Sequence, residues 1–386
     1  MRGRLGRTAF WQLGFRPFYL MGTVFASVSI LLWALQFTGI AAVGYLPGPF
    51  AHAHEMLFGF TLAIVVGFLF TAGSNWTGQP TPRGLALAAM ALVWTAARVL
   101  AVTPYAVAAA CTDVAFPLLA AAGIGKPLLA SRNRRNYFFV VLLLVLAAVD
   151  ALYHLSQLGV LPLQPRWAIQ AGLDIILVML TVMGGRVIPM FTNNGVADAG
   201  ARRIAAVEKA VIGLTVAVLA ADLAGMQGAW IAALLAACGC AHAVRWSLWH
   251  PWKTTRTPLV WILHAGYAWI PVHLLLRALA VFGYIAPSPA THALAVGAIG
   301  GVILGMVTRT ARGHTGRLLE AGRAETLAFV LIMIAAVVRV VVPIVAPQAM
   351  LLAVVVAGAC WSTAFGIYAV RYWPILTRRR ADGRAG

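Results

Sequence analysis

Long apolar runs, separated by short polar or basic segments, follow one another along almost the whole chain. They lie near residues 17–40, 54–74, 84–103, 105–124, 137–158, 167–190, 205–224, 228–246, 258–284, 289–308, 325–343 and 348–371. Each run is close to the ~20 residues that cross the hydrocarbon core of a bilayer as a helix. The pattern predicts an all-α fold, a polytopic membrane bundle of about twelve transmembrane helices.

The polar connections between these runs are short. The longest lie near residues 125–136, 191–204, 245–257 and 309–324. No soluble domain is therefore expected outside the bundle. The two halves of the chain show no convincing repeat, and no low-complexity linker separates them. Residues 1–386 are therefore interpreted as a single transmembrane bundle domain.

Composition and charge support this interpretation and fix an orientation. The chain is 62% hydrophobic and 10% charged, whereas soluble domains are roughly half apolar and a quarter charged. Nearly all of the 29 Lys and Arg fall at one side of the predicted bundle, so the positive-inside rule places both termini in the cytoplasm. The basic start at Arg2, Arg4 and Arg7 leads into an uncleaved anchor. The net charge of +19 then faces anionic lipid headgroups, and no nucleic acid partner is expected.

Several ionisable side chains lie inside the predicted spans, where each Arg or Asp costs about 2.5–3.5 kcal/mol on insertion scales. Arg98 and Asp113 lie on adjacent helices of one tight hairpin, so we expect them to pair. Asp150 and His154 share a helix face because they are four residues apart. Asp150 and His154 therefore form either a structural ion pair or part of a proton route.

The outer half of the predicted bundle is rich in histidine. His52 and His54 flank one alanine and precede Glu55. On an extended segment both rings share a side and could chelate one metal, whereas on a helix they diverge by about 200° and serve different partners. Imidazole is the commonest metal ligand, and an outer site suits copper or haem iron. The alternative is a pair of interfacial histidines that bond lipid headgroups.

The span at 258–284 carries a second set of polar side chains. His264 and Tyr267 share a helix face, and His273 lies about 180° round from His264. His264 and His273 therefore cannot bind the same centre. His264 is interpreted as a ligand on the inner side of the membrane, and His273 as a packing or outer polar residue.

The next span contains Gly297, Gly301 and Gly305 at a four-residue spacing. Such a stripe permits close packing of a neighbouring helix, and a flat porphyrin against the same face is the functional alternative. The basic segment Arg309–Arg317 follows and includes His314. Its arginines could hold carboxylates bidentately, and either haem propionates or lipid headgroups would suit them.

Several of these segments form motifs that occur in the same order in a known family. They are Phe15–Leu20 (FRPFYL), His52–Phe60 (HAHEMLFGF), Asn75–Gly78 (NWTG), Gly185–Thr192 (GRVIPMFT), His264–Trp269 (HAGYAW) and Gly313–Arg317 (GHTGR). In these motifs the chain resembles the NnrS family. The resemblance implies a multi-pass protein of the bacterial inner membrane that contains haem (of the b type) and copper and is linked to nitric oxide and nitrosative stress.

Carried onto this sequence, the resemblance implies His52, His54, His264, His292 and His314 as metal ligands. We expect His52, His54 and His292 at an outer centre, and His264 and His314 at a second, inner one. Tyr267, Arg309 and Arg317 complete the expected cofactor-binding set together with His264 and His314. Glu55, beside the outer ligands, is the expected catalytic proton donor.

The resulting hypothesis is a membrane haem–copper protein that binds nitric oxide and reduces it to nitrous oxide. Its partners would be nitric oxide, the lipid bilayer and an electron donor that the sequence leaves unidentified. One alternative is a non-enzymatic protein that binds or senses nitric oxide or handles metal. Another is a secondary transporter, although the loop at Asn75–Arg83 lacks the acidic and basic signature of the major facilitator family.

The predicted orientation can be tested with reporter fusions. Fusions after Pro47, Pro162 and Pro287 should give periplasmic signals, and fusions within 125–136 and 312–323 cytoplasmic ones, because the basic loops stay inside. Opposite signals at two or more of these sites would overturn the orientation.

Overall fold

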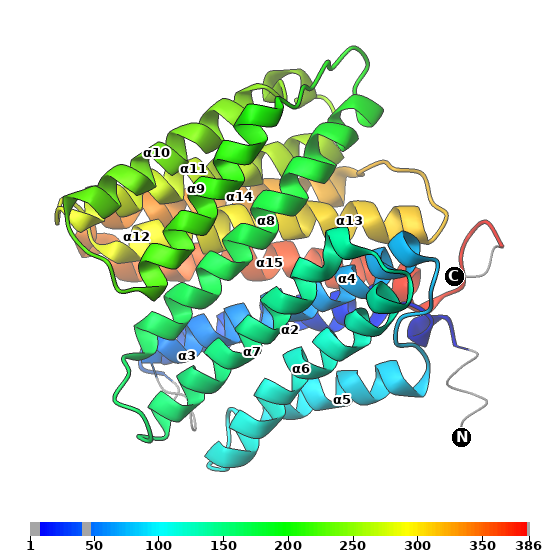
Figure 1. The fold of residues 1–386 in the computed structure, drawn as a ribbon, viewed down its shortest axis with the longest axis horizontal. Coiled ribbons are helices and arrows are strands. Elements are labelled where there is room, and N and C mark those ends of the chain that lie inside the picture. Colours follow the sequence, from blue (N-terminus) through cyan, green and yellow to red (C-terminus); the bar gives the residue numbers. More distant parts are fainter. Residues whose placement is uncertain (1–7, 41–47, 384–386) are drawn as a thin grey trace. The chain divides into compact units, whose positions relative to one another are not determined.

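The computed structural model describes residues 8–40 and 48–383, and this part of the chain is built from helices joined by short loops (Figure 1). The basic start at Arg2, Arg4 and Arg7 and the fusion position at Pro47 lie outside the described residues. All twelve predicted spans are helical, and no strand occurs in 8–40 or 48–383. The predicted all-α fold is therefore confirmed.

The helices have the following bounds. They are α2 (Phe15–Phe37), α3 (Gly48–His54), the π-helical η2 (Glu55–Thr61), α4 (Leu62–Thr77), α5 (Leu85–Leu100), α6 (Ala106–Ala130), α7 (Tyr137–Gln157), α8 (Pro165–Gly195), α9 (Ala205–Leu223), α10 (Ala229–Ser247), α11 (Pro258–Val281), α12 (Pro287–His292), the π-helical η5 (Ala293–Gly300), α13 (Gly301–His314), α14 (Arg323–Val345) and α15 (Met350–Thr377). Among the described residues, ten continuous helices are long and apolar enough to cross a membrane. Of the other two predicted spans, α5 is apolar but shorter, and α9 is a helix outside that set.

The helices form two compact units, which divide the region that was predicted as one domain. Unit 1 comprises 1–172, 310–318 and 368–386, and unit 2 comprises 173–309 and 319–367. Each unit contains segments that are distant in sequence, because the chain passes from unit 2 into unit 1 at residue 310, returns to unit 2 at residue 319 and enters unit 1 again at residue 368.

In unit 1, α2 packs along α4, and α6 packs against both α5 and α7. Buried aromatic side chains such as Phe18, Phe58 and Phe70 fill the space between these helices. The predicted partnership of Arg98 on α5 with Asp113 on α6 is confirmed, since the two form a buried ion pair. Unit 1 therefore carries charged side chains in its interior.

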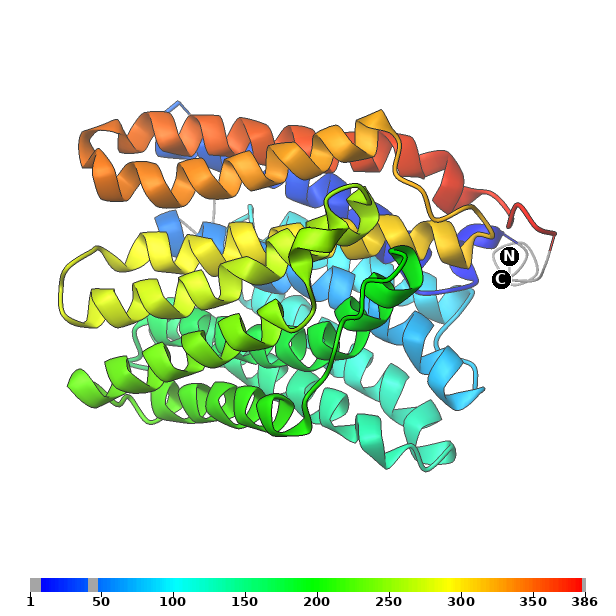
Figure 2. The same ribbon diagram turned by 90° about the horizontal axis from the view of Figure 1, so that it is seen from above.

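In unit 2, α11 packs against α10 on one side and against α12 and η5 on another (Figure 1 and Figure 2). The stripe formed by Gly297, Gly301 and Gly305 faces α11. A Cβ atom at Gly297 would collide with the Trp269 ring, and one at Gly301 would lie 3.1 Å from the Gly266 Cα. The stripe thus serves helix packing, and its face does not fit a porphyrin.

The close contact at Gly266 gives a test of this packing. In a Gly266→Ala variant, the new Cβ would lie 2.8 Å from the backbone nitrogen of Val302, which cannot move without shifting its helix. We expect a loss of about 1–3 kcal/mol in stability, the usual result of overpacking. Gly213→Ala is the matched control because that position has open space around it. Thermal unfolding of the purified protein should therefore show a lower midpoint for Gly266→Ala alone.

Candidate metal centre

The histidine pair near the start of the second span lies on a helix. His54 is the last residue of α3, and the π-helical η2 begins at Glu55; such segments often lie at functional sites. The His52 ring stacks on Trp33 of α2, with centroids 4.8 Å apart. The helical alternative therefore holds, and the two histidines contact different parts of unit 1.

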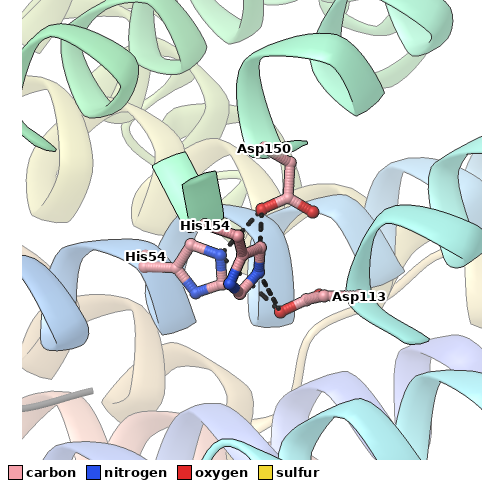
Figure 3. Close-up of side chains that lie close together, drawn as sticks. All are labelled: His54, Asp113, Asp150 and His154. Atoms are coloured by element: carbon pink, nitrogen blue, oxygen red, sulfur yellow. Dashed lines mark hydrogen bonds and ion pairs between the residues drawn. The ribbon is translucent and has the colours of Figure 1, made fainter. Parts of the chain in front are cut away.

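His54 meets three side chains from two other helices of unit 1. Asp113 comes from α6, and Asp150 and His154 come from successive turns of α7 (Figure 3). One ligand atom from each of the four residues lies within 4.8 Å of the other three. The four residues are 0–3% exposed, so water is excluded from the cluster. We call this group the His/Asp cluster.

Nitrogen and oxygen atoms alternate around the His/Asp cluster. His54 Nε2 lies 2.8 Å from Asp150 Oδ1 and 3.6 Å from Asp113 Oδ2. His154 Nε2 lies 3.5 Å from the same Asp150 oxygen and 3.4 Å from the same Asp113 oxygen. Ligands at about 2.1 Å from a tetrahedral metal are about 3.4 Å apart. The spacing of the donors therefore fits a single metal ion.

The charges in and around the His/Asp cluster also favour a cation. Asp113 and Asp150 belong to it, and Glu55 adjoins His54 at 3.2 Å. Arg98 is the cationic partner, in contact with Asp113 and 2.8 Å from Glu55. With neutral histidines, three carboxylates and one guanidinium leave an excess of two negative charges. A divalent metal ion would neutralise that excess, which a bilayer interior otherwise strongly disfavours.

Glu55 and Arg98 surround the His/Asp cluster as an outer layer. Each ring nitrogen of His54 faces a carboxylate, since Nδ1 lies 3.2 Å from Glu55 and Nε2 lies 2.8 Å from Asp150. If a metal ion took the place of a proton on Nε2, Glu55 would still accept the hydrogen bond from Nδ1–H. A carboxylate on the far nitrogen is the usual way to orient a metal-binding histidine. Arg98 reaches Glu55 because Gly59 has no side chain; a Cβ there would lie 2.5 Å from the guanidinium.

An arrangement without metal would require two further protons, carried by His54, His154 or the aspartates, to balance the two excess carboxylates. The Asp150 Oδ2 atom argues against this, since it is buried without a hydrogen-bond partner. Figure 3 shows this oxygen turned away from both rings. A buried carboxylate oxygen without a donor is unfavourable, and a metal ion on the same carboxylate would reduce its charge.

The other predicted site residues of unit 1 lie outside the His/Asp cluster. The His314 ring lies 5.5 Å from the Phe15 ring, and its carbonyl accepts a hydrogen bond from Arg380. Arg317 donates to the Thr315 carbonyl oxygen. A metal site needs three or more His, Cys, Asp or Glu side chains close together, and among the described residues the His/Asp cluster is the group that meets this condition. The roles assigned to His314 and Arg317 stay predictions.

His264 in unit 2 has one ring nitrogen with an available lone pair. Its Nε2 lies 2.8 Å from Thr192 Oγ1, whose own hydrogen goes to the Ile188 carbonyl oxygen. The imidazole therefore donates from Nε2 to Thr192, and Nδ1 carries the lone pair. That Nδ1 atom is buried without a hydrogen-bond partner, so its lone pair could bind a metal ion.

Arg309 is the other predicted residue of unit 2 that lacks an acidic partner. It is 6% exposed, and its guanidinium lies 4.1 Å from the Phe191 ring centroid. A buried cation of this kind fits a haem propionate. Tyr267 is different, because its hydroxyl already bonds His242 and Arg245. His292 is half-buried and donates from Nδ1 to the Ser288 carbonyl oxygen.

Three of the four residues in the His/Asp cluster were absent from the ligands expected from sequence. The sequence named His54 as a ligand, but it did not name Asp113, Asp150 or His154 as ligands. The i, i+4 spacing of Asp150 and His154 was a usable signal, because it places a carboxylate and an imidazole on one face of a span. The contact of Asp150 and His154 with His54 depends on how α7 packs in unit 1, which the spacing does not reveal.

A comparison with models of protein families matches residues 9–380 to the family described as NnrS protein. The match covers nearly the whole chain, including every residue of the His/Asp cluster. No curated protein matches the chain.

Substitution of a ligand should empty the His/Asp cluster. We expect His154→Ala and Asp150→Asn each to lower metal affinity by more than about 100-fold, since even outer partners of ligands contribute 10–100-fold. His250→Ala is the control, because that histidine bonds the Ala199 carbonyl oxygen in a loop. Elemental analysis after metal loading measures the result. Unchanged metal content in both cluster variants would show that the metal binds elsewhere.

Proposed function

The chain belongs to the NnrS family, and from this membership and the buried His/Asp cluster we propose a membrane metalloprotein that binds nitric oxide and reduces it to nitrous oxide. The observation that carries the proposal is the convergence of four buried donor atoms, from His54, Asp113, Asp150 and His154, within 4.8 Å of one another. Two imidazoles and two carboxylates suit copper as well as other divalent first-row metals. We assign copper to this cluster because it is the metal that the family resemblance implies.

The protein side chains hold, orient and enclose this centre. His54, Asp113, Asp150 and His154 would bind the copper, and the copper would supply redox chemistry and affinity for nitric oxide. Tyr153 stacks on the His54 ring, with centroids 4.5 Å apart and planes 18° apart, and fixes its orientation. Nitric oxide is small and uncharged, so it reaches a buried site through lipid without a polar entrance.

Glu55 is the residue we propose for proton delivery. Two molecules of nitric oxide take up two electrons and two protons to give nitrous oxide and water. The Glu55 side chain is 18% exposed, whereas that of His54, 3.2 Å away, is fully buried. Glu55 therefore connects the outside of the bundle with the cluster, as a general acid requires. Electrons must come from a donor outside this chain.

Haem is the second cofactor we propose. His264 would hold its iron, since its Nδ1 atom is buried without a hydrogen-bond partner. Arg309 would hold a propionate, since its buried guanidinium packs on Phe191 and pairs with no carboxylate among the described residues. His52, His292 and His314 remain candidate ligands implied by the resemblance. The haem would supply a redox centre that binds nitric oxide or passes electrons.

A second candidate function is the binding or storage of metal without turnover. The complete burial of His54 and Asp150 favours it, because a substrate must displace packed side chains to reach the centre. The two functions differ in one observable, the formation of nitrous oxide.

Turnover and the role of Glu55 can be tested together. Reduced, metal-replete protein given nitric oxide under anoxia should consume it and form nitrous oxide. Glu55→Gln should slow this by about 100-fold or more, the usual contribution of a general acid, and keep its metal because the amide oxygen still accepts from His54. Binding of nitric oxide in the visible spectrum without any nitrous oxide would leave only the binding or storage role.

A further inference from the structure

The segment at residues 49–84 recurs at residues 287–322, at a constant spacing of 238 residues. The identical pairs include Pro49 and Pro287, His54 and His292, Gly59 and Gly297, Gly67 and Gly305, Thr77 and Thr315, Gly78 and Gly316, and Gly84 and Gly322. The remaining positions have diverged, which is why the sequence pattern alone shows no convincing repeat. The retained residues are those that determine backbone shape and close packing.

The two copies also share their secondary structure. In each, an α-helical segment ends at the histidine and a π-helical segment follows, η2 after His54 and η5 after His292. An α-helix then leads to a glycine with positive φ, 64° at Gly78 and 71° at Gly316. Two π-helical segments at the same place are strong evidence of duplication, because such segments are rare.

The packing of each copy against its neighbouring helix is the same as well. A Cβ at Gly67 would meet Phe18 and Tyr19 of α2, and a Cβ at Gly305 would meet Ile262 and Leu263 of α11. The partners are spaced by 244 residues in both cases. The helix pair of α2 with α4 and that of α11 with α13 are therefore copies, and the expectation of no repeat is corrected for them.

The surroundings of the two equivalent histidines differ in charge. His54 is surrounded by carboxylates. His292 instead shares its helix face with Ser288, whose Oγ lies 3.3 Å from His292 Nδ1 and 3.4 Å from the Arg339 guanidinium on α14. The same guanidinium also lies 3.7 Å from the Met350 sulfur.

Arg339 has no carboxylate to neutralise it. All ten acidic residues of the chain lie in the described part, and none of them forms an ion pair with Arg339. An Arg in a membrane-spanning helix is unfavourable and requires a partner. Arg339, Ser288 and His292 are all half-buried, so an anion from the membrane surface or from solution can reach them.

We propose that Arg339 and Ser288, beside His292, form an anion-binding site for a phosphate-type group, at the position in unit 2 that corresponds to the candidate metal centre of unit 1. The guanidinium supplies a charge-assisted pair of donors, and the serine hydroxyl supplies a third. A phospholipid headgroup and free inorganic phosphate offer the same oxygen atoms. The duplicated helix would thus hold a cation in one copy and an anion in the other.

The test measures thermal unfolding of the purified, metal-loaded full chain. One arm adds inorganic phosphate in detergent at constant ionic strength, and the other compares nanodiscs of phosphatidylglycerol with nanodiscs of phosphatidylcholine. Binding raises the unfolding midpoint as ligand increases. Arg339→Gln should weaken the apparent affinity by about tenfold or more, and Ser288→Ala, which keeps the guanidinium, by less. Arg166→Gln, at an exposed arginine, should leave it unchanged.

A midpoint shift with phosphate in detergent identifies the free anion, and a shift with phosphatidylglycerol alone identifies the headgroup. The proposal is overturned if neither arm stabilises the wild type, or if Arg339→Gln and Arg166→Gln respond equally. Should Arg339→Gln fail to fold, Ser288→Ala against wild type decides the same question. The readout is independent of nitric oxide turnover, so it stands apart from the proposed function.

Discussion

Each ionisable side chain inside a membrane-spanning helix must find a partner of opposite charge or a bound ion, because hydrocarbon offers neither water nor counterions. In unit 1, Arg98 meets this requirement by pairing with Asp113 on the next helix and with Glu55 at the start of η2. These pairs draw α5, α6 and η2 together. Asp113, which pairs with Arg98, also faces the two histidines, so the candidate metal centre depends on this interaction.

The π-helical turn next to His54 fits this arrangement because its irregular carbonyl groups find other donors. Thr61 Oγ1 donates to the Met56 carbonyl oxygen at 2.8 Å. Trp94 Nε1, on α5, donates to that of Gly59 at 2.9 Å. Each bond satisfies a backbone acceptor that a regular α-helix would have used itself. The helix that carries Arg98 thereby also stabilises the π-helical turn beside the candidate ligand His54.

Charge balance distinguishes the two units. The interior of unit 1 has more carboxylates than cations around His54. Unit 2 neutralises Arg245 with Glu208, but it leaves Arg309 and Arg339 without acidic partners among the described residues. The copies of one helix pair therefore differ in their own side chains, such as Glu55 against Ala293, and in the side chains that contact them from neighbouring helices. The ligand chemistry of each copy depends on both.

The sequence by itself determined the positions of the spans, the all-α fold and the pairing of Arg98 with Asp113, and it named His54 as a candidate ligand. These follow from local hydropathy, from helical spacing and from adjacency in one hairpin. Only the tertiary structure decided that Asp150 and His154 meet His54. Spans that are apolar on all sides carry little signal of which face turns inward, so the rotation of α7 about its axis is fixed by packing. That rotation brings together side chains about a hundred residues apart.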